Sequence, residues 1–326
     1  MKILTTFATT TVLLFAQSAS ASFAVDALLK VYSGAGAGPF NAQAGQQLWI
    51  KTNRHDKSPV DRSCSSCHTS NLSNGGEHVK TKKPIKPMAP VINAKRLTDT
   101  KKIEKWFMRN CKWMLGRECS AQEKGDFLLY IQDSGVLMMN IYKKLVTVVA
   151  VTAASAVLFS GAVYGDDNEW GFGWFKQSKL DVAPVINPAY REECGSCHFA
   201  YQPGLLPEKS WRKMMAGLED HVGDNAELDA QTQKELLDYL VANSADKSNY
   251  KRSKRIMGSL RQAEVPLRIS DTLYFKRKHD EIPLRLVTAN KDVGSYSNCA
   301  ACHKNAEDGS FNEHEVNIPG VGRWED

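Results

Sequence analysis

The chain has 326 residues, of which 42% are hydrophobic and 24% charged, and its formal net charge is +6. This length allows about two or three domains. The charge is divided unequally, because residues 22–137 hold 18 Lys and Arg against 10 Asp and Glu, whereas residues 166–326 hold 21 against 26. Opposite charges favour electrostatic docking between the two halves, within one chain or between chains. No nucleic-acid-binding motif accompanies the basic half, so we expect no nucleic-acid partner.

Residues 1–21 have the pattern of a secretory signal peptide. Lys2 supplies the positive end, Thr11–Ala16 the apolar run, and Ala19–Ala21 the small residues of a cleavage site. We therefore expect an exported protein and exclude this segment from the fold.

Residues 22–137 form the first predicted module. An amphipathic helix is expected over Ala42–Asn53, followed by the pattern Cys-x-x-Cys-His at Cys64, Cys67 and His68. This pattern is the attachment signature of a c-type haem, in which two thiols form thioether bonds and the histidine ligates the iron. The pattern occurs twice more, at Cys194, Cys197 and His198, and at Cys299, Cys302 and His303.

A zinc or redox Cys-x-x-Cys followed by a chance histidine is the competing interpretation, and three copies in one exported chain argue against it. The sequence thus predicts three covalently attached haem c groups. Haems of this type are attached outside the inner membrane of Gram-negative bacteria, so the location is periplasmic. Two further cysteines, Cys111 and Cys119, remain, and an even remainder in an exported chain favours one disulfide over two buried thiols.

The rest of the first module alternates loops and helices. Lys80–Pro90 is basic and Pro-rich and predicts a loop. Thr98 or Asp99 is expected to cap a helix, and Ser120 with Glu123 forms a capping box for another. His55 and His78 lie in polar stretches and are expected to be solvated. For the sixth iron ligand, the position of Met88 fits the usual pattern, with Met108 and Met114 as weaker rivals.

The stretch from Trp106 to Cys119, with Cys64–His68 upstream, resembles the SHP-type (sphaeroides haem protein) cytochromes c over nearly all of residues 42–133. The matching parts are Glu104–Trp106, Arg109–Cys111 and Gly116–Cys119. The resemblance implies that Asn110 is the sixth ligand in place of Met88, and that Cys111 and Cys119 are disulfide-bonded.

A side-chain amide is a weak neutral ligand that suits ferric iron better than ferrous iron. We therefore expect Asn110 to leave on reduction and to open a position for O2, NO or CO. Distal polarity and access then decide between binding and activation.

Residues 138–165 resemble a second signal peptide. Two lysines, Lys143 and Lys144, precede an apolar segment over Leu145–Gly165 that is long enough to span a bilayer. The sequence predicts either cleavage after Gly165 or a membrane tether through 145–165, and a buried core helix is the remaining alternative.

Residues 166–326 form the second predicted module. An amphipathic helix is expected over Pro207–Leu218, with its apolar stripe in the core, and Asp229 is expected to cap the next helix. Lys247–Arg255 is strongly charged and predicts a solvated linker. Two histidines, His221 and His279, are each within 25 positions of a motif histidine.

This second module resembles the diheme cytochrome c (DHC) family over most of residues 181–320. The matching segments are Cys194–His198, Gly217–His221, Phe275–His279 and Cys299–His303. The resemblance implies two bis-histidine haems, with His221 and His279 as the distal ligands of the second and third motifs. His314 is a rival for the last site, but its acidic surroundings favour a solvated side chain.

The predicted fold is mainly α: a class I cytochrome c-like module followed by a mostly α diheme module with long loops. Saturated bis-histidine haems suit electron relay, whereas a labile ligand suits binding. The first hypothesis is thus electron transfer from a membrane cytochrome b-type donor through the diheme module to the first haem, which binds or reduces O2 or NO. The alternatives are a gas sensor, a pure electron carrier with a His/Met first haem, and a dihaem peroxidase, which the histidine count disfavours. Whether the first haem has oxidoreductase activity is left open.

Overall fold

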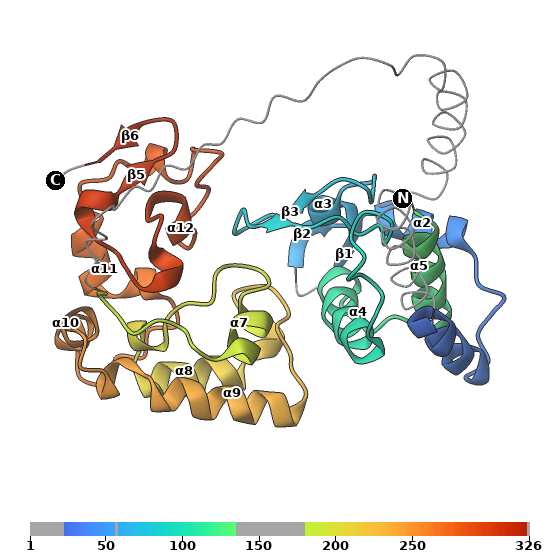
Figure 1. The fold of residues 1–326 in the computed structure, drawn as a ribbon, viewed down its shortest axis with the longest axis horizontal. Helices are drawn as coiled ribbons and strands as arrows, with labels where there is room; N and C mark the ends of the chain where they lie inside the picture. Colours follow the sequence, from blue (N-terminus) through green and yellow to red (C-terminus); the bar gives the residue numbers. More distant parts are fainter. Residues whose placement is uncertain (1–22, 56–57, 135–179, 325–326) are drawn as a thin grey trace, which may run out of the picture.

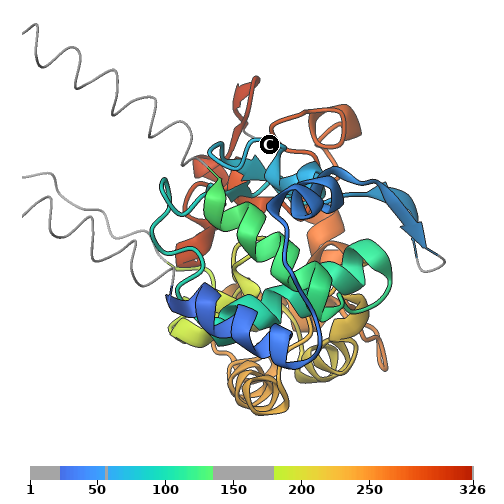
Figure 2. The same cartoon turned by 90° about the vertical axis from the view of Figure 1, so that its right-hand side faces the viewer.

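The computed structural model describes residues 23–55, 58–134 and 180–324. The predicted signal peptide, at 1–21, and the signal-like segment, at 138–165, lie outside these residues. Within the described ranges no helix has the length and apolar character needed to cross a bilayer. Two mainly helical units, 23–134 and 180–324, contact each other (Figures 1 and 2), and the strands in the described ranges form small two-stranded antiparallel sheets. The predicted mainly α fold class is confirmed.

The first unit is built on four helices whose ends follow from local sequence. A helix over residues 23–34 precedes α2 (Ala42–Ile50), α4 (Thr100–Leu115) and α5 (Ala121–Asp133). Asp99 caps α4 by accepting from the Lys102 amide, and Ser120 and Glu123 complete the predicted capping box of α5. Side-chain caps satisfy amides that have no partner in the first helical turn.

Helices α2 and α5 cross closely because a glycine lies at their contact. A Cβ atom on Gly45 would overlap the backbone carbonyl of Asp126. The core beside this crossing contains Trp49, Phe127 and Leu128, all nearly fully buried. The crossing fixes the helix that precedes the first haem motif against the last helix of the unit.

The first motif lies among short strands. Strands β1 (Asn53–His55) and β2 (Ser58–Arg62) form a hairpin that leads into α3 (Ser65–His68). A second hairpin, β3 (Gly76–Glu77) with β4 (Pro84–Ile85), points toward the second unit (Figure 1). The predicted loop at 80–90 therefore contains one short strand, β4.

The second unit consists of short helices joined by long loops. The α-helices are α7 (Pro188–Cys194), α8 (Glu208–Ala216), α9 (Ala230–Ala242), α10 (Lys251–Ser259), α11 (Leu273–Lys278) and α12 (Cys299–Cys302). The 3-10 helices are η1 (Pro203–Leu205), η2 (Leu218–Asp220), η3 (Ala245–Lys247), η4 (Ile269–Asp271), η5 (Leu284–Leu286), η6 (Ala306–Asp308) and η7 (Glu313–Glu315). Strands β5 (Asn317–Ile318) and β6 (Gly322–Arg323) pair near the end of the chain.

The core of the second unit confirms one expectation and corrects another. The stripe on α8 is core, since Trp211 and Met215 are each 3% exposed, and Asp229 caps α9 as expected. The prediction of a solvated linker at 247–255 was wrong, because most of these residues belong to η3 and α10. Helix α10 buries Ser253 and Ile256 on one narrow side while Lys251, Lys254 and Arg255 are exposed, so its composition concealed its periodicity.

Candidate haem-binding sites

Each of the three Cys-x-x-Cys-His motifs is partly helical. The motif residues lie on α3, at the end of α7 with the following turn, and on α12. Burial raises the pKa of the first thiol in each motif, Cys64, Cys194 and Cys299, to about 12. Redox and metal-binding cysteines need a lowered pKa. Within the described ranges no group of three or more His, Cys, Asp or Glu could hold a metal ion. The raised pKa is unlike that of an activated redox cysteine, and the Cys-x-x-Cys-His pattern itself is the attachment signature of haem c.

The second motif histidine faces a second histidine. The ring centroids of His198 and His221 lie 6.2 Å apart, with 41° between the ring planes. The Nδ1 atom of His198 is 2.7 Å from the Phe199 carbonyl oxygen, so it donates and leaves Nε2 as the basic nitrogen. Burial lowers the pKa of His198 to about 4 and also lowers that of His221. Both rings are thus neutral near pH 7, as metal ligation requires.

The third motif has the same arrangement. The rings of His279 and His303 have centroids 6.2 Å apart. The Nδ1 atom of His279 is 2.9 Å from the Phe275 carbonyl, and burial lowers the pKa of His303 to about 4. A cavity of about 410 Å³ is lined by both rings and by Cys299 and Cys302.

These pairs fit a metal atom held between two rings. Two imidazoles that bind one metal from opposite sides, each with a metal–nitrogen bond of about 2.0 Å, have centroids roughly 6 Å apart. The geometry pairs His198 with His221 and His303 with His279. His314 is exposed on η7, in agreement with its expected solvation.

The first motif histidine has different surroundings. Burial, with smaller contributions from Arg96 and His78, lowers the pKa of His68 to about 4. The aromatic ring in contact with His68 is Trp49, at 5.6 Å between centroids, and it is anchored by an indole N–H that donates to the Thr69 carbonyl at 2.9 Å. Among the described residues, no second histidine ring contacts His68.

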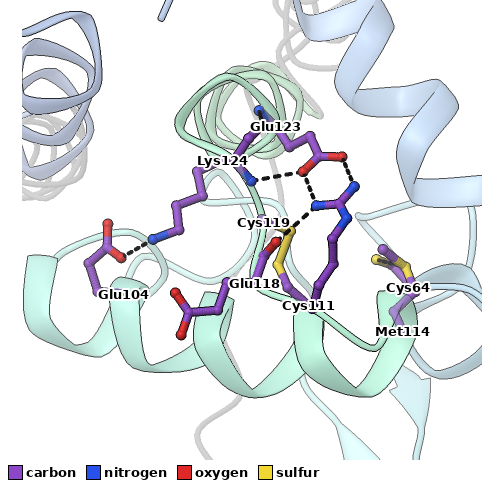
Figure 3. The surroundings of a disulfide bond; sticks show 10 residues. Cys64, Glu104, Cys111, Met114, Glu118, Cys119, Glu123 and Lys124 are labelled. Atoms are coloured by element: carbon purple, nitrogen blue, oxygen red, sulfur yellow. Dashed lines mark hydrogen bonds and ion pairs between the residues drawn. A yellow bond between two sulfur atoms is a disulfide. The ribbon is translucent and has the colours of Figure 1, made fainter. Parts of the chain in front are cut away.

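Helix α4 carries the residue expected as the sixth ligand of this motif. Asn110 shares a helix face with Phe107 and Met114, because residues three and four apart lie on one side of a helix. Met114 Sδ lies 3.3 Å from Cys64 Sγ, so the Met114 side chain reaches the first motif (Figure 3). Asn110 itself is exposed, whereas Met88 packs against the apolar core.

A disulfide joins the residue after Asn110 to the start of α5. Cys111 and Cys119 are bonded, both are buried, and their Cα atoms lie 5.5 Å apart (Figure 3). The turn between them is closed by a bidentate pair in which Arg117 donates to Glu123, at 2.8 Å for each bond. The end of α4 is therefore tied covalently and ionically to α5.

One residue was misjudged from the sequence. His78 was expected to be solvated but is only 9% exposed, and burial lowers its pKa. Its Nδ1 atom accepts from the Thr81 amide at 3.2 Å, within the hairpin of β3 and β4. Its neighbours in sequence are polar, and no local pattern indicates that its ring is buried.

The comparisons with known proteins agree with this division. The family model for dihaem cytochrome c matches residues 190–311, and a model described as a domain of unknown function (DUF1924) matches residues 35–131. The cytochrome c-type protein SHP of Cereibacter sphaeroides is 36% identical over 104 residues, which are 32% of this chain and 79% of that protein. Cytochrome c'' of Methylophilus methylotrophus is 43% identical over 81 residues, 24% of this chain and 56% of that protein. The diheme cytochrome c structure from Shewanella baltica is 45% identical, covering 43% of this chain and 98% of that chain, with a TM-score of 0.36.

Covalent attachment motifs on a mainly helical fold define a haem protein of the electron-transfer class. Within that class, the chain belongs to the c-type cytochromes, with an SHP-type first part joined to a DHC-family second part.

Proposed function

We propose that the protein is a periplasmic triheme cytochrome c in which two bis-histidine haems supply electrons to a first haem that binds or reduces O2 or NO. Haem c supplies reversible one-electron chemistry and, where one axial position opens, a site for a diatomic gas. The observation that carries the proposal is the contrast between the motif histidines. His198 and His303 each face a second imidazole, whereas His68 contacts Trp49.

The second unit is organised to hold its axial ligands rigidly. Hydrogen bonds from Nδ1 of His198 and of His279 to backbone carbonyls orient one ring of each pair. A ligand set that stays in place in both oxidation states favours rapid electron exchange and leaves no position for a substrate. The proposed roles are axial ligation by His198 with His221, and by His303 with His279.

The first unit is organised differently. The proposed sixth ligand, Asn110, is an amide, and it is flanked by a disulfide that limits how far the end of α4 can move. We propose that Asn110 binds in the ferric state, leaves on reduction, and returns on oxidation. The proposed electron donor is a membrane cytochrome of the b type.

The test compares ferric and ferrous spectra of the full-length holoprotein, with and without NO, for the native chain, Asn110→Ala and Met88→Leu. We expect a high-spin ferrous first haem that binds NO rapidly in all three proteins. Asn110→Ala should leave the sixth coordination position of the ferric haem open. Met88→Leu should have the spectra of the native chain, since Met88 packs in the core. A thioether absorption band that disappears in Met88→Leu, together with a ferrous form inert to NO, would instead establish an ordinary electron carrier.

A further inference from the structure

One face of α4 is a row of cations that meets the second unit. Residues three or four apart lie on one face of a helix, and four basic residues follow this spacing: Lys102, Lys105, Arg109 and Lys112. Opposite them lie three acidic residues of the second unit, Glu192, Glu193 and Glu227. Glu193 pairs with both Lys105 and Arg109. The charge asymmetry of the sequence is thus concentrated where the units touch.

The centre of this contact is almost fully shielded from solvent. The Arg109 side chain is 4% exposed and its partner Glu193 is 13% exposed, whereas the exposed pair Arg54 and Asp61 has values of 64% and 58%. Arg109 also donates from Nε to the Glu227 backbone carbonyl at 2.7 Å. A guanidinium removed from water needs all of these partners, because an unpaired buried charge is strongly unfavourable. Separation of the units would therefore rearrange Arg109.

The same contact holds the end of α4 at further points. Lys112 donates to the Glu227 carboxylate at 2.9 Å. Arg62 bridges the units, since it donates to the Trp113 carbonyl at 2.9 Å and to the Gly223 carbonyl at 3.2 Å. The restrained residues thus lie on both sides of Asn110.

The hairpin of β3 and β4 extends the contact to the second haem motif. Thr81 and Lys83 donate to backbone carbonyls of Cys197 and Gly195, and Lys83 also donates to the His198 carbonyl at 3.2 Å. The hairpin lies directly on the first motif as well, because a Cβ on Gly76 would overlap the Cys67 carbonyl. It therefore packs between the backbones of the first and second motifs.

We propose that the cation row of α4 is a docking surface for residues 180–324 and that this docking restrains the release of Asn110. The proposal rests on the proposed function in one respect, namely that Asn110 is an iron ligand. Arg109 and Lys112 act as positioning residues. While they are paired with the second unit they hold the α4 backbone in place. The distance that Asn110 can move away from the iron is then limited by the docked helix. When docking is weakened, the helix end moves more freely and Asn110 exchanges faster.

The coupling is reciprocal. If docking favours the state in which Asn110 is bound, then displacement of Asn110 by another ligand must lower the equilibrium constant of docking by the same factor. The acidic segment of the second unit should therefore become more exposed to solvent when the first haem takes up an external ligand.

The test uses the full-length ferric holoprotein and imidazole as the probe that displaces Asn110. The limiting rate at saturating imidazole reports Asn110 dissociation, and amide hydrogen exchange over residues 106–113 reports the freedom of α4. We expect Glu227→Gln to raise the limiting rate by about 5-fold, which corresponds to a barrier lowered by about 1 kcal/mol, and to speed exchange in α4. The charge-reversed pair Lys112→Glu with Glu227→Lys should restore both values toward the native ones. High ionic strength should have the same effect on the native chain as Glu227→Gln.

The matched control is Asp61→Asn, which removes an exposed ion pair of the first unit and should leave both measurements unchanged. Faster exchange in α4 with an unchanged limiting rate would overturn the coupling, and so would no change in either measurement. If Asn110→Ala leaves the ferric spectrum unaltered, the proposed ligand is wrong. That result concerns the proposed function and is separate from the hydrogen-exchange result on docking.

Discussion

The rings of His198 and His221 face each other with centroids 6.2 Å apart, although 23 positions separate them in the sequence. The same distance separates His279 and His303. We expect His221→Met to raise the reduction potential of one haem and His279→Met that of another, because a thioether favours ferrous iron more than imidazole does. Redox titration followed by visible spectra measures both shifts.

The control for this pair of variants is His314→Ala, which changes an exposed histidine of η7 and should leave every potential unaltered. Native potentials and spectra in both methionine variants would remove these histidines from the ligand set and make His314 the next candidate.

Haem content is the simplest prediction. Six motif cysteines predict three covalent haems, and replacing both cysteines of the third motif, Cys299 and Cys302, by Ala should leave two. Mass spectrometry of the denatured protein counts the haems that remain attached. Fewer than three on the fully matured native chain would contradict the assignment, and fragments starting near Ser22 and Asp166 would reveal cleavage at both signal-like segments.

The ion pair that closes the disulfide turn gives a pH-dependent prediction. Hydrogen bonds from Arg117, with a further contribution from the Ser120 amide, lower the pKa of Glu123 from 4.5 to about 2. A carboxyl group whose pKa is lowered by folding stabilises the protein fully above its unfolded pKa and loses that effect as the pH falls through the folded value. We expect Glu123→Gln to reduce the free energy of unfolding by about 1 kcal/mol at pH 7, with the difference disappearing between pH 4.5 and 2. Denaturant titrations across this range measure it, and Glu118→Gln, an exposed carboxylate of the same turn, is the control.

The close crossing of α2 and α5 predicts a steric effect. In Gly45→Ala the new methyl group meets the Asp126 backbone, which cannot rotate away as a side chain could. We expect a loss of about 1–3 kcal/mol in the free energy of unfolding. Gly34→Ala, where nothing lies within 4 Å of the added atom, is the matched control. Equal stabilities of the two variants would show that the helices can separate at no cost.

Local patterns in the sequence predicted the features that depend on neighbouring residues. The capping residues Ser120 and Asp229 act within a single helical turn, so their sequence context was sufficient, and the structure decides for Asp99 over Thr98 as the cap of α4. The burial of His78 depends on the folding of the β3–β4 hairpin around its ring, and its polar neighbours in the chain do not indicate this.

The pairing of the histidines was implied by the family resemblance and by no local pattern, because it depends on the paths of two loops in space. The sequence-based prediction missed α10 for a different reason. One buried isoleucine, Ile256, among many basic residues gives only a weak helical periodicity. The charge asymmetry predicted docking in general terms, and the buried position of Arg109 could be found only in three dimensions.

The contact between the two units is chemically one-sided. Away from the cation row of α4, Arg62, Lys80 and Lys83 of the first unit donate to main-chain oxygens of the second, such as those of Gly223 and Val222. A peptide oxygen is present whatever side chain the residue bears. Mutations that accumulate over evolutionary time should therefore be tolerated at these main-chain acceptors and eliminated at their donors, whereas Glu193 and Glu227, which accept through their side chains, should be retained.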